Sequence, residues 1–241
     1  MNSKPEKGQF LALIPAWIWI FVLVPMFIPI LGLGVWEQVE TTIWMEIVYH
    51  IANGILMLLL MYSYLKEDWF MVTTDFGYYL KHIALTVGLI AGTEWTLLNT
   101  FSFFGFNPTI MLEFLPLVEM SVCQTPLLLI DIKPILGAIT VSVFAPISVC
   151  ALFYCLGFSP VCTKKTWPAY LCIAAVTLIP TIIDILWRGQ AALFLSGYLV
   201  RLPIHLLACW SYQKTDNVWT PLVSLAIVNL LASVLLPIIL F

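Results

Sequence analysis

Charged side chains are scarce in this sequence, and their scarcity excludes several classes of protein. Asp, Glu, Lys and Arg make up 10% of the 241 residues, and the formal net charge is −3. The only adjacent basic pair is Lys164-Lys165. A nucleic-acid partner is therefore not expected, because binding to phosphates needs clustered basic side chains. The same shortage argues against a polybasic site for anionic lipids.

The sequence motifs of common catalytic centres are also missing. The chain contains no H-E-x-x-H, His-x-His, C-x-x-C or G-x-S-x-G pattern, and it has no adjacent pair of glutamates. These absences remove the simplest signatures of zinc hydrolases, thiol redox proteins and serine hydrolases. The six cysteines mostly fall in apolar segments. There they are expected to be small packed residues and not metal ligands or disulfides.

Long apolar runs are what the sequence has in abundance. Hydrophobic residues make up 62% of the chain, and the mean hydropathy is +1.02. About 20 apolar residues cross the hydrocarbon core of a bilayer. Transmembrane spans are predicted near residues 10–33, 44–65, 79–98, 135–158, 168–187, 191–210 and 219–240. The first of these runs lacks a small-residue cleavage site, so it is predicted to be a retained span.

Residues 109–130 are apolar enough to cross a membrane, but they include two glutamates and two prolines. These are Glu113, Pro116, Glu119 and Pro126. The segment is therefore either an additional span or an interfacial or re-entrant segment. The sequence predicts an all-α fold, namely one integral membrane domain over residues 1–241 with about seven or eight transmembrane helices.

The lysines indicate an orientation for this membrane domain. Cytoplasmic loops carry an excess of Lys and Arg. Seven spans with a cytoplasmic N-terminus leave only Lys133 and Arg188 on the outer side, whereas an eighth span would move Lys214 and the Lys164-Lys165 pair outside. We therefore predict a multi-pass protein of the cell membrane, with its N-terminus in the cytoplasm and the lipid bilayer as its surroundings.

The stretch from Trp210 to Phe241 carries a family resemblance. A polar turn over 213–217 precedes Trp219, Pro221 and an apolar helix. This arrangement resembles the third conserved segment of the CAAX-processing and bacteriocin-immunity (CPBP) family of intramembrane metalloproteases. In that family a histidine and an asparagine or aspartate lie four residues apart, on one helical face. Here Asn229 matches the second position, but the histidine position is Leu225, which cannot bind a metal.

The first motif of the CPBP family aligns with residues 145–154, before a loop that leads to Trp167 and Pro168. The family's two glutamates fall on Val149 and Cys150, and its arginine falls on Tyr154. Valine has no polar atom, so general-base catalysis is excluded at this position. The resemblance covers about residues 135–240 and implies a CPBP-like helical core.

The second motif of the family, a phenylalanine and a histidine four residues apart, aligns most closely with residues 180–184. Asp184 could replace the histidine as an oxygen ligand. Asp184 and Arg188 are also four residues apart, however, and a local ion pair explains both more simply.

A displaced metal site is the alternative to a lost one. Glu46 and His50 are four residues apart on one predicted helical face, and such a pair can bind zinc. A catalytic zinc normally needs a third protein ligand. The candidates for that ligand are Glu94, Glu119, Asp184 and His205. A hydrogen-bonded Glu–His pair at the membrane interface is the simpler interpretation, so no cofactor is predicted, with zinc as the alternative.

Arg201 is the most unusual charged residue in the sequence. It lies about ten residues into the predicted span that begins at Ala191, so it would be about 15 Å deep. His205 follows one helical turn later on the same face. A buried ion pair with Glu94 or Glu119 is the structural explanation, since an unpaired arginine at this depth is costly. A cavity that binds an anion or a carboxylate, lined by Arg201 and His205, is the functional one.

These observations predict a non-catalytic CPBP-like membrane protein that acts as a scaffold, as a regulator or as an immunity-type binder of a membrane protein or peptide. At the positions of the family's charged and imidazole side chains this sequence has other residues, while the turn and helix frame that resembles the family remains. Two alternatives stay open. One is an intramembrane metalloprotease, similar to CAAX prenyl endopeptidases, with displaced ligands, and the other is a small-solute carrier built around Arg201.

Overall fold

The computed structural model describes residues 39–103, several positions between 136 and 150, and residues 167–188 and 198–240. All of the regular secondary structure in these parts of the chain is helical, which confirms the predicted all-α class for them. The complete helices are α3 (Val39–Leu60), α4 (Tyr62–Thr74), α5 (Phe76–Phe103), α10 (Trp167–Arg188), α11 (Leu199–Thr215) and α12 (Trp219–Leu240).

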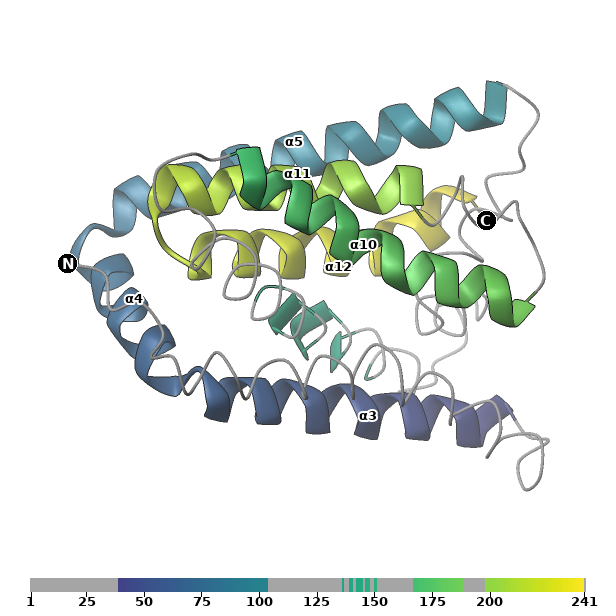
Figure 1. The fold of residues 1–241 in the computed structure, drawn as a ribbon, viewed down its shortest axis with the longest axis horizontal. Coiled ribbons are helices and arrows are strands. Elements are labelled where there is room, and N and C mark those ends of the chain that lie inside the picture. Colours follow the sequence, from purple (N-terminus) through teal and green to yellow (C-terminus); the bar gives the residue numbers. More distant parts are fainter. Residues whose placement is uncertain are drawn as a thin grey trace.

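The helix pair α11–α12 lies at the centre of this arrangement. Helix α5 packs along both members of the pair, and α10 packs on α11 (Figure 1). Helix α3 runs along the opposite edge of the molecule from α5, and the short helix α4 brings the chain from one to the other (Figure 1). Helix α4 also contacts α12. The junction of α4 with α5 therefore lies close to the turn between α11 and α12.

The sequence of α11 explains why it is central. Its buried residues recur at helical spacing along its whole length. They are Val200, Ile204, Ala208, Cys209, Ser211, Tyr212 and Thr215. The fully buried Ala208 of α11 and Ala169 of α10 belong to the same core cluster, and small side chains of this kind let helices approach closely. The core is completed by side chains of α12, among them Leu222, Leu225 and Val228.

Hydropathy does not predict helix α4, because the charged residues Lys66, Glu67 and Asp68 interrupt the apolar run. The sequence gives no element between the predicted spans 44–65 and 79–98. The structure instead continues as a helix to Thr74 after a break at Met61. Leu65, Asp68 and Val72 are buried, and their spacing of three and four residues places them on one helical face. A search for long apolar runs does not detect so short an amphipathic helix.

The predicted segments 79–98, 168–187 and 219–240 all fall within helices. Helix α12 has the predicted limits, and α10 extends one residue further at each end. Helix α11 continues past residue 210 to Thr215, so the predicted polar turn 213–217 is wrong in its first three residues, and the turn covers residues 216–218. The predicted spans 10–33 and 109–130, and most of 135–158, lie outside the described residues. Judged by length and hydropathy, none of the helices in the described part of the chain qualifies as a membrane-spanning segment.

Candidate functional site

The turn between α11 and α12 is built from three residues with distinct backbone roles. Asp216 adopts the left-handed conformation (φ 49°, ψ 36°), and its N–H donates to the carbonyl oxygen of Tyr212 at 2.7 Å. This is a common way to end a helix, although glycine or asparagine usually occupies the position. The carbonyl of Val218 accepts the first hydrogen bond of α12, from Leu222 N–H at 3.2 Å. One helix therefore ends and the next begins within three residues.

Asp68 of α4 caps the N-terminus of α12. Its carboxylate oxygen Oδ2 accepts a hydrogen bond from the backbone N–H of Val218 at 2.7 Å. Its backbone carbonyl accepts a second hydrogen bond, from Nδ2 of Asn217 at 2.8 Å. Only 2% of Asp68 is exposed. A residue about 150 positions earlier in the chain thus satisfies a backbone donor that the helix itself cannot satisfy.

Asn217 connects three parts of this cap. Besides its bond to Asp68, its Oδ1 accepts a hydrogen bond from the backbone N–H of Trp219 at 2.9 Å. The side chain of Tyr79, on α5, also hydrogen-bonds with Asn217. Asn217 is fully buried. The buried amide thus uses both its donor and its acceptor groups. Its hydrogen bonds fix α4, α5 and α12 relative to one another.

Trp219 fastens α12 to α4 from the other side of the turn. Its indole Nε1–H donates to the carbonyl oxygen of Leu65 at 2.8 Å. Its ring packs edge-on against Trp69, with centroids 5.0 Å apart and an interplanar angle of 64°. This is a favourable aromatic geometry. We name the group Asp68, Asn217, Val218 and Trp219 the cap cluster.

A polar layer extends from the cap cluster into the contact between α5, α11 and α12. The hydroxyl oxygens of Thr86 and Ser211 are 2.9 Å apart. Thr215 donates to the carbonyl of Ser211 at 2.9 Å, and Ser224 donates to the carbonyl of Thr220 at 2.7 Å. All five residues are buried. Hydrogen bonds of this kind satisfy the buried hydroxyl groups. Only the bond between Thr86 and Ser211 joins two different helices in this set, so it also adds an interhelical contact.

Burial raises the pKa of Asp68 to about 7, from an ordinary value of 3.8. Loss of hydration is the main cause, and the carboxylates of Asp216 and Glu67 act in the same direction. The hydrogen bond from Val218 opposes them. A carboxyl group with this pKa is partly protonated near neutral pH.

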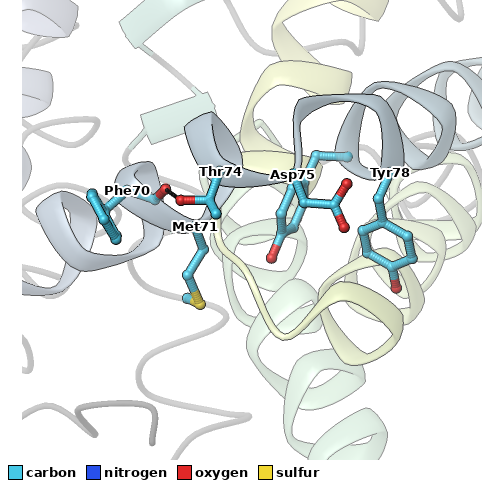
Figure 2. A pocket seen from close by; sticks show the side chains of 6 residues that line it. Phe70, Met71, Thr74, Asp75 and Tyr78 are labelled. Atoms are coloured by element: carbon cyan, nitrogen blue, oxygen red, sulfur yellow. Dashed lines mark hydrogen bonds between the residues drawn. The ribbon is translucent and has the colours of Figure 1, made fainter.

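An open pocket of about 390 Å³ lies beside the cap cluster, where α4 meets α5. Its walls are formed by Phe70, Met71, Thr74, Asp75, Tyr78 and Tyr79 (Figure 2). The pocket is therefore mostly aromatic and apolar, with one carboxylate. Its volume falls within the usual range for small-ligand sites.

The structure places two of the predicted CPBP motif positions, Leu225 and Cys150, in the core. Leu225 is 6% exposed and belongs to the core cluster. Cys150 is fully buried in the same cluster. Asn229 lies one turn after Leu225 on α12 and is half-buried. Val149 and Tyr154 lie outside the described residues.

The predicted pair Arg201 and His205 lies on α11, one turn apart, and both side chains are half-buried. His205 has a partner that the sequence did not suggest, because its Nδ1 is 3.0 Å from the hydroxyl oxygen of Thr177 on α10. Glu94 lies on α5, which packs against α11. The ion pair between Glu94 and Arg201 stays a prediction, and Glu119 lies outside the described residues.

The predicted metal ligands are only partly described. Glu46 and His50 both lie on α3, and Asp184 and Arg188 lie on α10. The side chains of Glu46, Asp184 and Arg188 lie outside the described part of the structure. Among the side chains that are described, no three of the His, Cys, Asp and Glu type lie close enough together to hold a metal ion.

Sequence reasoning missed the cap cluster, although three of its four residues lie in the stretch from Trp210 to Phe241. The sequence points to the polar turn 213–217 and to Trp219, but it gives no role to Asp68. The available signal was the i, i+3, i+7 spacing of Leu65, Asp68 and Val72, which is typical of an amphipathic helix with one polar residue on its buried face. Comparison of the chain with protein-family models, curated proteins and solved structures found no match.

Proposed function

We propose that this chain is a polytopic membrane protein with a CPBP-like core that acts without catalysis, by binding a membrane protein or a membrane-associated peptide. The lipid bilayer would be its solvent and the cell membrane its location. The proposal combines the apolar composition of the whole chain with the roles of particular side chains in the helical bundle.

The observation that carries the non-catalytic part is the environment of Leu225. In the family that the sequence resembles, this position holds a metal-binding histidine. Here a leucine packs in the core with Leu222 and Val228 on the same helix. Cys150, at the position of a family glutamate, is buried in the same cluster. Both positions therefore contribute packing, which supports loss of the metal site and retention of the frame.

Large apolar side chains on the outside of the bundle support the membrane and binding parts. Along α5 they recur over the full length of the helix, and they are Leu80, Leu85, Leu89, Trp95 and Phe103. Exposed apolar surface on this scale is unusual for a monomeric protein in water, and it is typical of surfaces that meet lipid or a partner. A helix in lipid can satisfy its backbone internally and present such side chains outward.

The first experiment is the metal content of detergent-purified protein, measured by mass spectrometry. The comparison is a triple variant, Glu46→Ala, His50→Ala and Asp184→Ala. The proposal expects no bound zinc in either sample. Near-stoichiometric zinc that disappears in the triple variant would overturn it in favour of a metalloprotease with displaced ligands.

The binding part is tested by site-specific photo-crosslinking in native membranes. A photoreactive residue at Leu85, which is exposed on α5, should give a discrete crosslinked product. The matched control is Ile90 on the same helix, which is fully buried and should crosslink only within the chain. Equal patterns from the two positions, or release of the protein from membranes by alkaline carbonate, would contradict the proposal.

A further inference from the structure

The pocket at the α4–α5 junction combines aromatic rings with a single acid. Phe70, Tyr78 and Tyr79 supply three rings, and Asp75 supplies one carboxylate. No basic side chain is among the described residues that line it. Figure 2 shows the Asp75 carboxylate beside Tyr78 at one end of the pocket and Phe70 at the other. The lining therefore has one negative charge and ring electron density. His82 does not line the pocket, but its ring packs against Tyr78 with centroids 4.6 Å apart.

Two of the three aromatic rings of the pocket are held in place before any ligand arrives, whereas Phe70 is 72% exposed. The hydroxyl of Tyr78 donates to the carbonyl oxygen of Lys214 at 3.2 Å, which ties it to the end of α11. Tyr79 is 7% exposed and is bonded to Asn217 of the cap cluster. The two tyrosine rings meet edge-on, with centroids 5.3 Å apart. A pocket with rings fixed in this way loses little conformational entropy on binding.

The backbone at Asp75 explains why its carboxylate is available. Asp75 is the one residue between α4 and α5. Its N–H donates to the carbonyl of Met71 at 3.1 Å, and its own carbonyl accepts from Tyr79 N–H at 3.3 Å. Both bonds use backbone atoms, and the residue is exposed. The side chain is therefore placed at the mouth of the pocket without being required for the junction.

We propose that this pocket binds a quaternary ammonium group. A weakly hydrated organic cation is attracted to the faces of aromatic rings, and sets of such rings are the usual receptors for choline-type groups. One carboxylate completes the charge balance at the entrance. The group could come from a free choline-type cation or from a phosphatidylcholine headgroup, since the recognised chemistry is the same.

The test is isothermal titration calorimetry on the full-length protein in a maltoside detergent, which contains no ammonium group. Choline chloride is titrated first, against sodium chloride of equal ionic strength. The neutral isostere 3,3-dimethylbutanol and short-chain dihexanoyl phosphatidylcholine follow. Saturable binding of choline, with no binding of the neutral isostere, is the expected result. Binding of the short-chain lipid alone would assign the site to a headgroup, and binding of free choline would assign it to the soluble cation.

Variants connect the binding to the pocket. Asp75→Asn should weaken binding about tenfold and Tyr78→Leu by a similar factor. The matched control is Glu67→Gln, which removes an exposed acid of α4 that does not line the pocket, and it should bind as the parent protein does. The proposal is wrong if neither choline nor the lipid saturates, if the neutral isostere binds equally well, or if both pocket variants bind unchanged. Two variants are used so that misfolding of one still leaves a decisive result from the other.

Discussion

Replacing Asp68 by asparagine should remove a pH dependence of stability while leaving the fold intact. Asparagine has nearly the same shape, and its Oδ1 can accept the hydrogen bond that Val218 N–H now donates at 2.7 Å. The backbone carbonyl of residue 68, which accepts from Asn217, is unaffected. The substitution therefore changes the charge of the cap cluster and preserves its hydrogen bonds.

The size of the effect follows from the pKa of Asp68, which burial raises from 3.8 to about 7. Between those values the folded protein holds a proton that the unfolded chain releases, so stability falls as pH rises through this window. Below pH 4 both states are protonated and no penalty exists. Above pH 7 the penalty is complete. At 1.36 kcal/mol for each pKa unit, it reaches about 4 kcal/mol at most.

The assay is the apparent Tm from tryptophan fluorescence, measured from pH 4.5 to pH 8 in one detergent. The parent protein should lose about 10 °C across this range relative to Asp68→Asn, and the two should differ least at the acidic end. Asp68→Leu is the second variant. It has no acceptor for Val218 N–H and should be less stable than Asp68→Asn at every pH, by about 1–3 kcal/mol. A parent protein that becomes more stable than Asp68→Asn as pH rises would refute the reasoning, since it would show a lowered pKa.

Three further predictions concern the same part of the bundle and use the same assay. Asn217→Ala removes a buried amide with several partners and should cost about 2–3 kcal/mol, whereas Asn99→Ala, which loses one bond to its own exposed helix, should change the apparent Tm little. Leu225→Ala should cost about 2–5 kcal/mol through a core cavity, and Leu231→Ala, where 40% of the side chain is exposed, should cost much less. Asp216→Gly should stabilise by up to about 1 kcal/mol, because glycine adopts the left-handed conformation without strain; a loss of stability would show that the Asp216 side chain is needed.

Hydropathy predicted the helices that are uniformly apolar. Helix α12 has the predicted limits, and α10 differs by one residue at each end, since both consist of long apolar runs bounded by polar residues. The same reasoning failed at α4 and at the end of α11. In both, polar residues such as Asp68 and Thr215 lie on the buried face, so average hydropathy falls just where helical periodicity continues.

The candidate sites also divide into features that the sequence indicates and features that only the packing of the helices creates. Motif alignment pointed to Leu225 and Asn229 and to the polar turn before Trp219. It could not show that this turn is held by Asp68, since pairing over such a sequence separation depends on how α4 packs against α12. The pocket at Asp75 could not be predicted from the sequence either, because its aromatic rings come from two helices, α4 and α5, that meet at this one residue.

The cap cluster supports the proposal of a CPBP-like frame, because it fixes the start of α12 without using the positions of that family's catalytic side chains. The N–H groups of Val218 and Trp219 lie at the N-terminus of α12, where the helix itself offers them no acceptor. Burying these donors without a hydrogen bond would destabilise the fold. Asp68 and Asn217 satisfy both, and Trp219 adds a bond to Leu65. These interactions fix the entry of α12 independently of any side chain at positions 225 or 229. The turn is therefore fixed whichever residue occupies position 225, and the leucine found there adds to the core.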